Sequence, residues 1–355
     1  MSELIIQDII VPGYERVVHI VDAASGLNAF IAIHSTALGP SLGGMRMWPY
    51  PTEVEALDDA KKLARAMSYK AAIAQTGQGG GKAVIIGDPK TKTEAMFLAL
   101  GRAIESLGGS YIAAEDMNIT VADLETVGRE TRWVSGLSVD RGSSGNPSPL
   151  TAVGCLVAIR ACFKEVFGDD RTEGRSVAIQ GVGAVGGRLA DLCRDAGMKI
   201  AVCDLDASRA RAVADRAGAT FLDGPDAALT HPCDVCAPCG RGGILNANSI
   251  PKLRCRIVAG AANNQLAEPG DALRLQQRGI LYAPDYVVNA GGIINIACEF
   301  APGGYSAAAA QERVKTIATA LAEVFRIARE QSITTAEAAD HLAEARITAA
   351  QRAIK

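Results

Sequence analysis

Two lysines and an aspartate in the first half of the sequence are of types that could carry acid–base chemistry. Lys70 ends a segment with apolar residues at helical spacing, Lys82 directly follows the glycines at 79–81, and Asp116 follows a short strand-like segment. Adjacent glycines permit steep backbone turns and a close approach by substrate or cofactor. They also leave the Lys82 ammonium without neighbouring side chains to solvate it, which lowers a lysine pKa toward the range of a general base. Lys82 is therefore the candidate base.

The same stretch, GQGGGKAVII, invites comparison with a phosphate-binding loop, which also ends in Gly-Lys. Thr76 stands where the first glycine of that motif belongs, and Ala83 stands where its metal-binding hydroxyl belongs. The order is also reversed, because the strand-like run follows Lys82 instead of preceding it. Nucleotide binding by Lys82 is therefore not expected.

A second constellation, in the second half of the chain, has the pattern of a dinucleotide-binding loop. Residues 181–186 read G-x-G-x-x-G, follow a short apolar run and open a helical pattern, and Asp204 ends the next strand-like segment. The glycines let backbone N–H groups approach a pyrophosphate at a helix N-terminus. Asp204 can accept hydrogen bonds from both adenosine ribose hydroxyls and would repel a 2′-phosphate. NAD is favoured over NADP, although Arg209 keeps NADP open.

The sequence contains no motif typical of metal binding or of acyl transfer. The four histidines form no metal-binding spacing, and no G-x-S-x-G motif occurs. Cys233, Cys236 and Cys239 read C-x-x-C-x-x-C, but Gly243 occupies the place of the fourth cluster ligand. All nine cysteines lie between Cys155 and Cys298. Their odd number indicates reduced thiols in a cytoplasmic protein, and no metal is expected.

Composition narrows the possible partners. The net charge of −3 and the pI near 5.9 give no electrostatic case for nucleic acid or an anionic membrane. The first residues lack the basic start and apolar stretch of a signal peptide, and no apolar run reaches the length of a membrane helix. A chain of 355 residues exceeds one ordinary core, so two domains are expected.

The order of patterns supports that division. The first part mixes strand-like and helical segments and ends at RGSSGNPSPLTAVG, the densest Ser/Gly/Pro stretch, which we interpret as a hinge. A long helix is expected over 151–167, and from Arg175 strands and helices alternate as in β-α-β units. The last fifty or so residues are helical, and Thr334 with Glu337 predicts a capping box for the final helix.

These segments together resemble the glutamate/leucine/phenylalanine/valine dehydrogenases, with the closest likeness to the leucine dehydrogenases. The resemblance covers essentially the whole chain and is carried, in the family's order, by LGPSLGGMRMWPY, MSYKAAIAQTGQGGGKAVIIGDP, YIAAEDMN, GSSGNPSPLTAVG, GVGAVGG, CAPCG, VAGAANNQLAE and YAPDYVVNAGGIINIA. It implies a two-domain α/β fold. An N-terminal α/β substrate and oligomerisation domain would span 1–145 and a Rossmann NAD-binding domain 146–330. A C-terminal helix, 331–355, would pack back on the first domain.

The resemblance also implies an activity, the reversible oxidative deamination of an L-amino acid to its 2-oxo acid and ammonium. Lys82 would activate the water that attacks an imine, Asp116 would be the second proton-transfer residue, and Lys70 would bind the substrate α-carboxylate. Asn263 would contact both substrate amine and cofactor, and Thr151 would bind the nicotinamide carboxamide. The implied contacts to NAD are Arg46, Thr151, Gly181, Val182, Gly183, Ala184, Val185, Gly186, Gly187, Asp204, Leu205, Cys239, Ala261, Ala262 and Asn263.

Substrate choice follows from one replacement. Glutamate dehydrogenases carry a lysine for the distal carboxylate at the position of Leu42, and burying an unpaired carboxylate costs several kcal/mol, which excludes glutamate. The expected apolar pocket consists of Leu42, Gly43, Ala114, Ile293 and Ile296. The isoleucines favour leucine, valine or isoleucine. Met45, in place of a usual threonine, and the segment EDMN keep phenylalanine or tryptophan open.

Alternatives of other classes remain beside this one. A non-catalytic NAD-binding sensor could share the fold, although Lys70, Lys82 and Asp116 argue for turnover. A hydroxy-acid dehydrogenase would need a histidine acid/base that no matching segment supplies. The family forms homo-oligomers, dimers and octamers among them, and the sequence does not choose between these.

Overall fold

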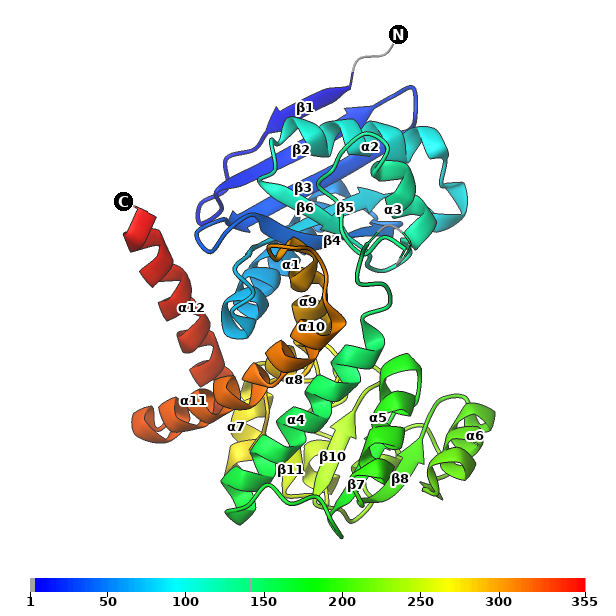
Figure 1. Cartoon of the computed structure of the whole chain (residues 1–355), viewed down its shortest axis with the longest axis vertical. Helices are drawn as coiled ribbons and strands as arrows, with labels where there is room; N and C mark the ends of the chain where they lie inside the picture. Colours follow the sequence, from blue (N-terminus) through cyan, green and yellow to red (C-terminus); the bar gives the residue numbers. More distant parts are fainter. Residues whose placement is uncertain (1–3, 139, 141, 355) are drawn as a thin grey trace. The chain divides into compact units, whose positions relative to one another are not determined.

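The computed structural model describes residues 4–138, 140 and 142–354, and its contacts divide the chain into two compact units (Figure 1). The first unit comprises Met1–Gly145, Ile296–Ser306 and Ala343–Lys355, and the second comprises Asn146–Asn295 and Ala307–Leu342. The first boundary falls inside the Ser/Gly/Pro-rich segment. The C-terminal part divides differently from the expected 331–355, because the return to the first unit begins at Ala343.

The first unit contains a mixed six-stranded sheet in the order β1-β2-β3-β5-β4-β6. Strand β1 pairs antiparallel with β2, β2 with β3, and β3 with β5. Strand β4 pairs parallel with both β5 and β6. The strand bounds are β1 Ile5–Asp8, β2 Arg16–Asp22, β3 Leu27–Ser35, β4 Ser41–Trp48, β5 Gly79–Ile86 and β6 Tyr111–Ala114.

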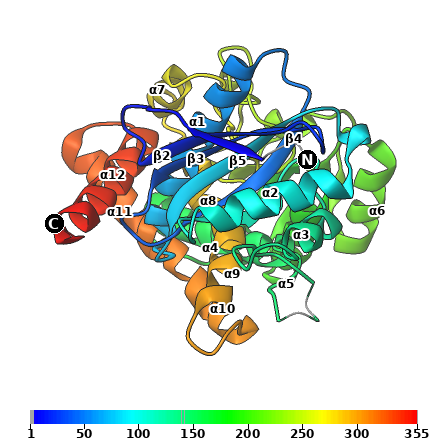
Figure 2. The same ribbon diagram turned by 90° about the horizontal axis from the view of Figure 1, so that it is seen from above.

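Helices cover the two faces of this sheet (Figure 2). The helix α1 (Glu53–Ala74) packs on one face through the small residues Ala56, Ala60 and Ala64. The helices α2 (Glu94–Ser106) and α3 (Val121–Val127) pack on the other face, against the larger side chains of the main core. Small residues on α1 permit a close approach of this helix to the sheet. Lys70 lies on the helix and Lys82 lies on the sheet.

The glycines before Lys82 do not form the turn that their sequence suggests. They are the first residues of β5, and the strand therefore includes Lys82 instead of starting after it. None of Gly79, Gly80 and Gly81 has a positive φ. A Cβ on Gly80 would lie 2.0 Å from the backbone nitrogen of Ser68 on α1. Close packing of helix on strand, not a steep turn, therefore requires Gly80, while Gly79 and Gly81 are limited by neighbouring groups of the sheet such as the Ser35 carbonyl and the Ser41 hydroxyl.

Two helix bounds also differ from the expected ones. The helix α1 continues past Lys70 to Ala74 because Ala71, Ala72 and Ala74 are strong helix formers, and it ends at Gln75 in the left-handed conformation. Helix α4 begins at Ser148, not at residue 151, because Pro149 fits a first helical turn.

The second unit contains a parallel sheet in the order β12-β11-β10-β7-β8-β9, the doubly wound arrangement expected for a Rossmann domain. Its strands are β7 Ser176–Gln180, β8 Lys199–Cys203, β9 Thr220–Phe221, β10 Val235–Pro238, β11 Ile257–Val258 and β12 Leu281–Tyr282. The strand order reverses between β7 and β10, so the carboxyl ends of these two strands form the switch point at which such folds bind ligands.

The remaining helices follow the chain as α4 Ser148–Phe167, α5 Ala184–Asp195, α6 Ala207–Ala217, α7 Gly270–Gln277, α8 Asp285–Val288, α9 Gly291–Ala297, α10 Ala307–Val314, α11 Thr316–Gln331 and α12 Thr335–Ile354. The predicted capping box is confirmed at the start of α12. The Thr334 hydroxyl accepts from the Glu337 backbone N–H at 3.2 Å, and the Glu337 carboxylate accepts from the Thr334 N–H at 2.9 Å. Further along, Arg346 donates to the carbonyls of Ala72 and Ile73. The C-terminal half of α12 thus packs on the first unit, as expected.

Candidate active site

The first unit brings Lys82 and Asp116 into direct contact. The Lys82 Nζ donates to Asp116 Oδ2 at 2.5 Å, and the lysine side chain is only 6% exposed. Lys82 lies in the middle of β5, while Asp116 lies just beyond the end of β6. The two candidate proton-transfer groups therefore form one buried ion pair.

A glycine on the intervening strand makes this contact possible. Strand β4 lies between β5 and β6, so an ordinary side chain on β4 would separate the two partners. Gly44 is paired with Ala114, and a Cβ on Gly44 would lie 2.6 Å from the Cβ of Asp116. The missing side chain leaves room for the Asp116 carboxylate to cross β4. Gly44 was not among the residues expected from sequence, and only its place in the LGGMR segment hinted at it.

Strand alternation decides which expected pocket residues share the face of Lys82. Leu42 pairs with Gly80, two residues before Lys82, and alternation places Leu42, Gly44 and Arg46 on one face of the sheet. Leu42 is 1% exposed and Ala114 is 4% exposed. Gly43 occupies an alternate position, and its carbonyl accepts the hydroxyl of Tyr111 at 2.6 Å. Leu42 and Ala114 thus present apolar side chains on the same face as the ion pair.

Arg46 adds a second cation and a second carboxylate to this face. Its Nε donates to Asp116 Oδ2 at 2.9 Å, and its Nη1 donates to Asp59 Oδ2 at 3.1 Å. The Tyr50 hydroxyl also donates to Asp59. Sequence reasoning assigned Arg46 to cofactor binding and missed Asp59 and Tyr50 altogether. No sequence motif indicates Asp59 or Tyr50. Their contacts depend on which side of α1, and of the loop before it, faces β4, and the sequence alone does not show this.

Burial and the network act on Lys82 in opposite directions. Burial is the larger influence and lowers the pKa of Lys82, while the Asp116 carboxylate partly offsets it. Burial alone would raise the pKa of Asp116, but the charges of Lys82 and Arg46 outweigh it and lower that pKa. The pair therefore combines an ionised carboxylate with a lysine that releases its proton more readily than usual.

Lys70 lies on α1, the helix that packs on the sheet face of Lys82. It is half-buried in the last turn and a half of the helix. Its role in binding the substrate carboxylate stays a prediction.

The glycine loop of the second unit fits a dinucleotide pyrophosphate. Gly181 has φ +87°, and a Cβ on it would lie 2.5 Å from Gly240 Cα at the end of β10. A Cβ on Gly186 would lie 2.0 Å from the Gly181 carbonyl oxygen, whereas Gly183 has open space around it. These are the requirements of a tight turn, of close helix packing and of unhindered approach by a phosphate, in that order. No side chain caps the N-terminus of α5, so its N–H groups are available to an anion.

Asp204 lies beside the glycine loop and also accepts a hydrogen bond from its backbone. Its Oδ2 accepts the backbone N–H of Val182 at 2.7 Å, and its Oδ1 accepts that of Asp206 at 2.9 Å. Arg209 Nη1 lies 3.5 Å from Asp204 Oδ1. Leu205, the next residue, is 88% exposed. The carboxylate expected to bind ribose therefore also holds the glycine loop in place.

The loops after β10 and β11 carry the other expected cofactor residues. Cys239 donates its N–H to the Gln180 carbonyl at 2.7 Å, and Ala262 donates to Pro238 at 2.9 Å. Asn289, absent from the expected set, donates to Asn263 Oδ1 at 2.7 Å and to the Ala261 carbonyl at 3.1 Å. Asn289 therefore fixes the orientation of the Asn263 amide.

Three further expected residues lie on helices. Thr151 is the fourth residue of α4, and its hydroxyl donates to the Pro147 carbonyl at 3.0 Å. Ile293 and Ile296 lie on α9, where Ile293 is 5% exposed and Ile296 is half-buried. The division of the chain assigns Ile293 to the second unit and Ile296 to the first.

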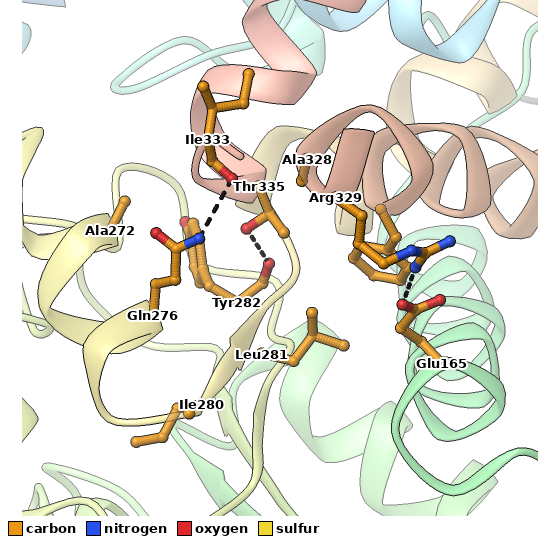
Figure 3. A pocket seen from close by; sticks show the side chains of 12 residues that line it. Glu165, Ala272, Gln276, Ile280, Leu281, Tyr282, Ala328, Arg329, Ile333 and Thr335 are labelled. Atoms are coloured by element: carbon orange, nitrogen blue, oxygen red, sulfur yellow. Dashed lines mark hydrogen bonds and ion pairs between the residues drawn. The ribbon is translucent and has the colours of Figure 1, made fainter. Parts of the chain in front are cut away.

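One cavity in the second unit contains none of these residues (Figure 3). It has a volume of about 280 Å³ and lies among α4, α7, β12, α11 and the start of α12. Apolar side chains such as Leu281 and Ile280 line it, and its polar groups are paired. Thr335 donates to the Tyr282 carbonyl at 2.6 Å, and Arg329 forms an ion pair with Glu165. Because it contains none of the expected site residues, we assign this cavity no role in the reaction.

Comparison with known proteins decides the family. Residues 15–137 match the domain described as Glu/Leu/Phe/Val dehydrogenase, dimerisation domain, and residues 201–354 match the Glutamate/Leucine/Phenylalanine/Valine dehydrogenase domain. A leucine dehydrogenase from Thermoactinomyces intermedius is 49% identical over 94% of this chain and 91% of its own length. The chain belongs to the Glu/Leu/Phe/Val dehydrogenase family. The resemblance inferred from sequence is thus confirmed, and so is the expected class of enzyme, an amino-acid dehydrogenase.

Similar proteins act on different amino acids, so the similarity alone does not identify the substrate. A valine dehydrogenase from Streptomyces coelicolor is 45% identical over 96% of this chain and 93% of its own length. The crystal structure of L-tryptophan dehydrogenase from Nostoc punctiforme matches with a TM-score of 0.86 and 40% identity, covering 96% of this chain and 97% of that one. The expected two-domain α/β fold is confirmed by this agreement.

Two further observations concern the described residues alone. No group of three or more His, Cys, Asp or Glu side chains among them is arranged to hold a metal ion, and all nine cysteines are free thiols. No helix among the residues that the structure describes is long and apolar enough to cross a membrane.

Proposed function

We propose that the protein catalyses the NAD-dependent, reversible oxidative deamination of a branched aliphatic L-amino acid, with leucine, valine and isoleucine preferred. The amino acid, NAD⁺ and water yield a 2-oxo acid, ammonium, NADH and a proton. The observation that carries this proposal is the buried Lys82–Asp116 pair on the same sheet face as the apolar Leu42. The leucine and valine dehydrogenases that it resembles support the choice of substrate.

The residues of the first unit would act on the substrate as follows. A bound NAD⁺ would supply the hydride acceptor for the substrate Cα, and loss of that hydride leaves the substrate as an imine. Lys82 takes a proton from the water that attacks this imine, and Asp116 exchanges a proton with the departing amine. Lys70 pairs with the α-carboxylate. A lysine whose pKa is lowered by burial suits this role, because its neutral form is populated nearer to neutral pH.

The second unit would hold the cofactor. Gly183 and the N-terminus of α5 would receive the pyrophosphate, Asp204 the adenosine ribose, and Leu205 would offer an exposed apolar surface beside it. We propose NAD over NADP because the Asp204 carboxylate would repel a 2′-phosphate. The protein would be a cytoplasmic homo-oligomer, a dimer or an octamer.

Phenylalanine and tryptophan are the second candidate substrates. The L-tryptophan dehydrogenase that matches the fold at 40% identity favours this alternative. Leu42 and Ala114 are apolar and compatible with either class, so measured specificity must separate the two.

The proposed role of Lys82 is tested by the variant Lys82→Ala. Loss of a general base typically costs about 10²–10⁴-fold in rate, and we expect turnover to fall about a thousandfold. NAD⁺ affinity, measured by calorimetry, should stay within about twofold because the glycine loop is unchanged. Lys90→Ala, at an exposed lysine on the same unit, is the matched control and should retain full turnover. Near-normal turnover of Lys82→Ala would remove Lys82 from the mechanism.

A further inference from the structure

The network around Lys82 includes a second carboxylate that the proposed reaction does not use. Asp59 lies on α1 and accepts hydrogen bonds from Arg46 Nη1, at 3.1 Å, and from the Tyr50 hydroxyl. Its side chain is 29% exposed, and that of Arg46 is 20% exposed. Arg46 in turn donates to Asp116. The guanidinium is therefore held between two carboxylates that come from different elements.

This arrangement affects Asp116, because one of its carboxylate oxygens accepts hydrogen bonds from two cations. Both Lys82 Nζ, at 2.5 Å, and Arg46 Nε, at 2.9 Å, donate to Asp116 Oδ2. An arginine side chain with no second partner would populate several rotamers, and each would change its distance from that oxygen. Asp59 selects the rotamer in which Nε points at Asp116.

Tyr50 supports Asp59 from the other side. Burial, followed by the hydrogen bond to Asp59, raises the pKa of Tyr50, so its hydroxyl remains a donor throughout the working pH range. Tyr50, Arg46 and Asp59 also line a hollow of about 540 Å³ with Trp48 and Met117. The charged network therefore runs from a buried lysine to the wall of a solvent-accessible hollow.

We propose that Asp59 is a positioning residue for the proposed deamination. Asp59 holds Arg46 against Asp116 and so sets the charge around Lys82. The inference rests on the proposed function of Lys82. It adds a residue on α1 whose effect on the reaction passes through Arg46.

The sign of the effect follows from the charges that face Lys82. These are Asp116 at the end of β6, Arg46 on β4 and Asp59 on α1. The two carboxylates favour the Lys82 ammonium, and Arg46 disfavours it. Loss of Asp59 removes a carboxylate charge but also releases Arg46 from Asp116, and the Arg46 cation acts on Lys82 more strongly than the Asp59 carboxylate does. Lys82 should then lose its proton at a higher pH than in the unaltered protein.

The test measures the titration of Lys82 without turnover. Competitive labelling of lysines by acetic anhydride, read by peptide mass spectrometry across pH in the full chain without substrate, reports the midpoint of each amine. Asp59→Asn should move the Lys82 midpoint up by about half a unit to one unit, the lower end of effects of neighbouring charges. Asp59→Glu, which keeps the charge, should restore it. Asp58→Asn is the matched control, because Asp58 is the preceding residue on α1 and pairs with Lys61 instead.

Arg46→Gln should give the same sign and protects the test from a folding failure of Asp59→Asn. Removal of the Arg46 cation should move the Lys82 midpoint up. In the Arg46→Gln background, Asp59→Asn should have at most about half of its effect in the unaltered protein, because coupled residues are not additive. Activity should agree: Asp59→Asn is expected to lower kcat about tenfold, to leave KM for the amino acid within about twofold and to move the acidic limb of the rate profile to higher pH.

An unchanged Lys82 midpoint in Asp59→Asn, or a shift downward as the lost charge alone would give, would overturn the proposal. An equal shift with and without Arg46 would also overturn it, since Asp59 would then act by its charge alone. Because the labelling uses no substrate, these outcomes are separate from the fate of the proposed function, which Lys82→Ala decides.

Discussion

At the scale of residues, the lowered pKa of Lys82 has a different origin from the one that its sequence suggests. Flanking glycines predicted an ammonium without neighbours, whereas the structure gives Lys82 an aspartate at 2.5 Å and an arginine beyond it. Burial outweighs the aspartate, so the direction of the shift is the expected one. Asp59 and Tyr50 escaped prediction because residue spacing does not show which side chains meet across a helix and a sheet.

The pH dependence of the reaction should therefore respond to Asp116. In the proposed mechanism the reactive form of Lys82 is neutral, so kcat/KM should fall as pH drops through the lowered pKa of Lys82. The Asp116 carboxylate raises that pKa against burial. In Asp116→Asn the acidic limb of the kcat/KM profile should move to lower pH, while kcat falls about a hundredfold because proton transfer is lost. Glu115→Gln, at the exposed neighbour, is the control and should leave the profile unchanged. A limb that moves to higher pH would contradict this account of the pair.

Cofactor choice should depend on Asp204, but the variant must preserve the loop. Asp204→Ala would also remove the acceptor for the Val182 N–H. Asp204→Asn retains an acceptor oxygen and removes only the charge. It should raise the ratio of kcat/KM for NADP⁺ to that for NAD⁺ about tenfold or more, since repulsion of a 2′-phosphate disappears and Arg209 lies nearby. If the unaltered protein already prefers NADP⁺, the assignment of Asp204 to the ribose is wrong.

At the scale of elements, close packing of α1 on β5 and the gap on β4 position the reactive pair. A helical period correctly predicted α1, and the alternation of strands and helices correctly predicted the β7–α5–β8 unit. The extended state of the glycines was not predicted, because glycine is permitted in turns and strands alike, and only the tertiary contact with Ser68 decides between them.

Gly80→Ala tests this packing. The added Cβ would lie 2.0 Å from the Ser68 nitrogen, so α1 must move away from the sheet. Overpacking of this kind typically costs about 1–3 kcal/mol, and the midpoint of denaturant unfolding should fall accordingly. Turnover should fall as well, because α1 carries Lys70. Gly270→Ala, where a Cβ has space, is the control and should be nearly neutral. Equal stability of the two variants would contradict the proposed role of Gly80.

At the scale of the whole molecule, the sequence predicted the family and the two-domain α/β architecture, and the comparisons confirm both. The C-terminal segments divide between the two units in a way that the sequence did not predict. Dense motifs in order identify a family, whereas the return of residues 296–306 to the first unit depends on long-range contacts. Glu299 shows why: its carboxylate accepts the N–H of Ser144 at 2.8 Å and the hydroxyl of Ser143 at 2.7 Å. No local pattern announces such a contact.

The central claim is that this family member deaminates branched aliphatic amino acids with NAD⁺. The most direct measurement is kcat/KM, followed by NADH absorbance, for the twenty common L-amino acids with NAD⁺ and with NADP⁺. Burial of each additional methylene contributes about 0.8 kcal/mol. Leucine, valine and isoleucine should therefore exceed alanine by about one to two orders of magnitude, with NAD⁺ as the better cofactor. A higher kcat/KM for phenylalanine or tryptophan than for all three would contradict the aliphatic assignment, and no turnover with any amino acid would contradict catalysis itself.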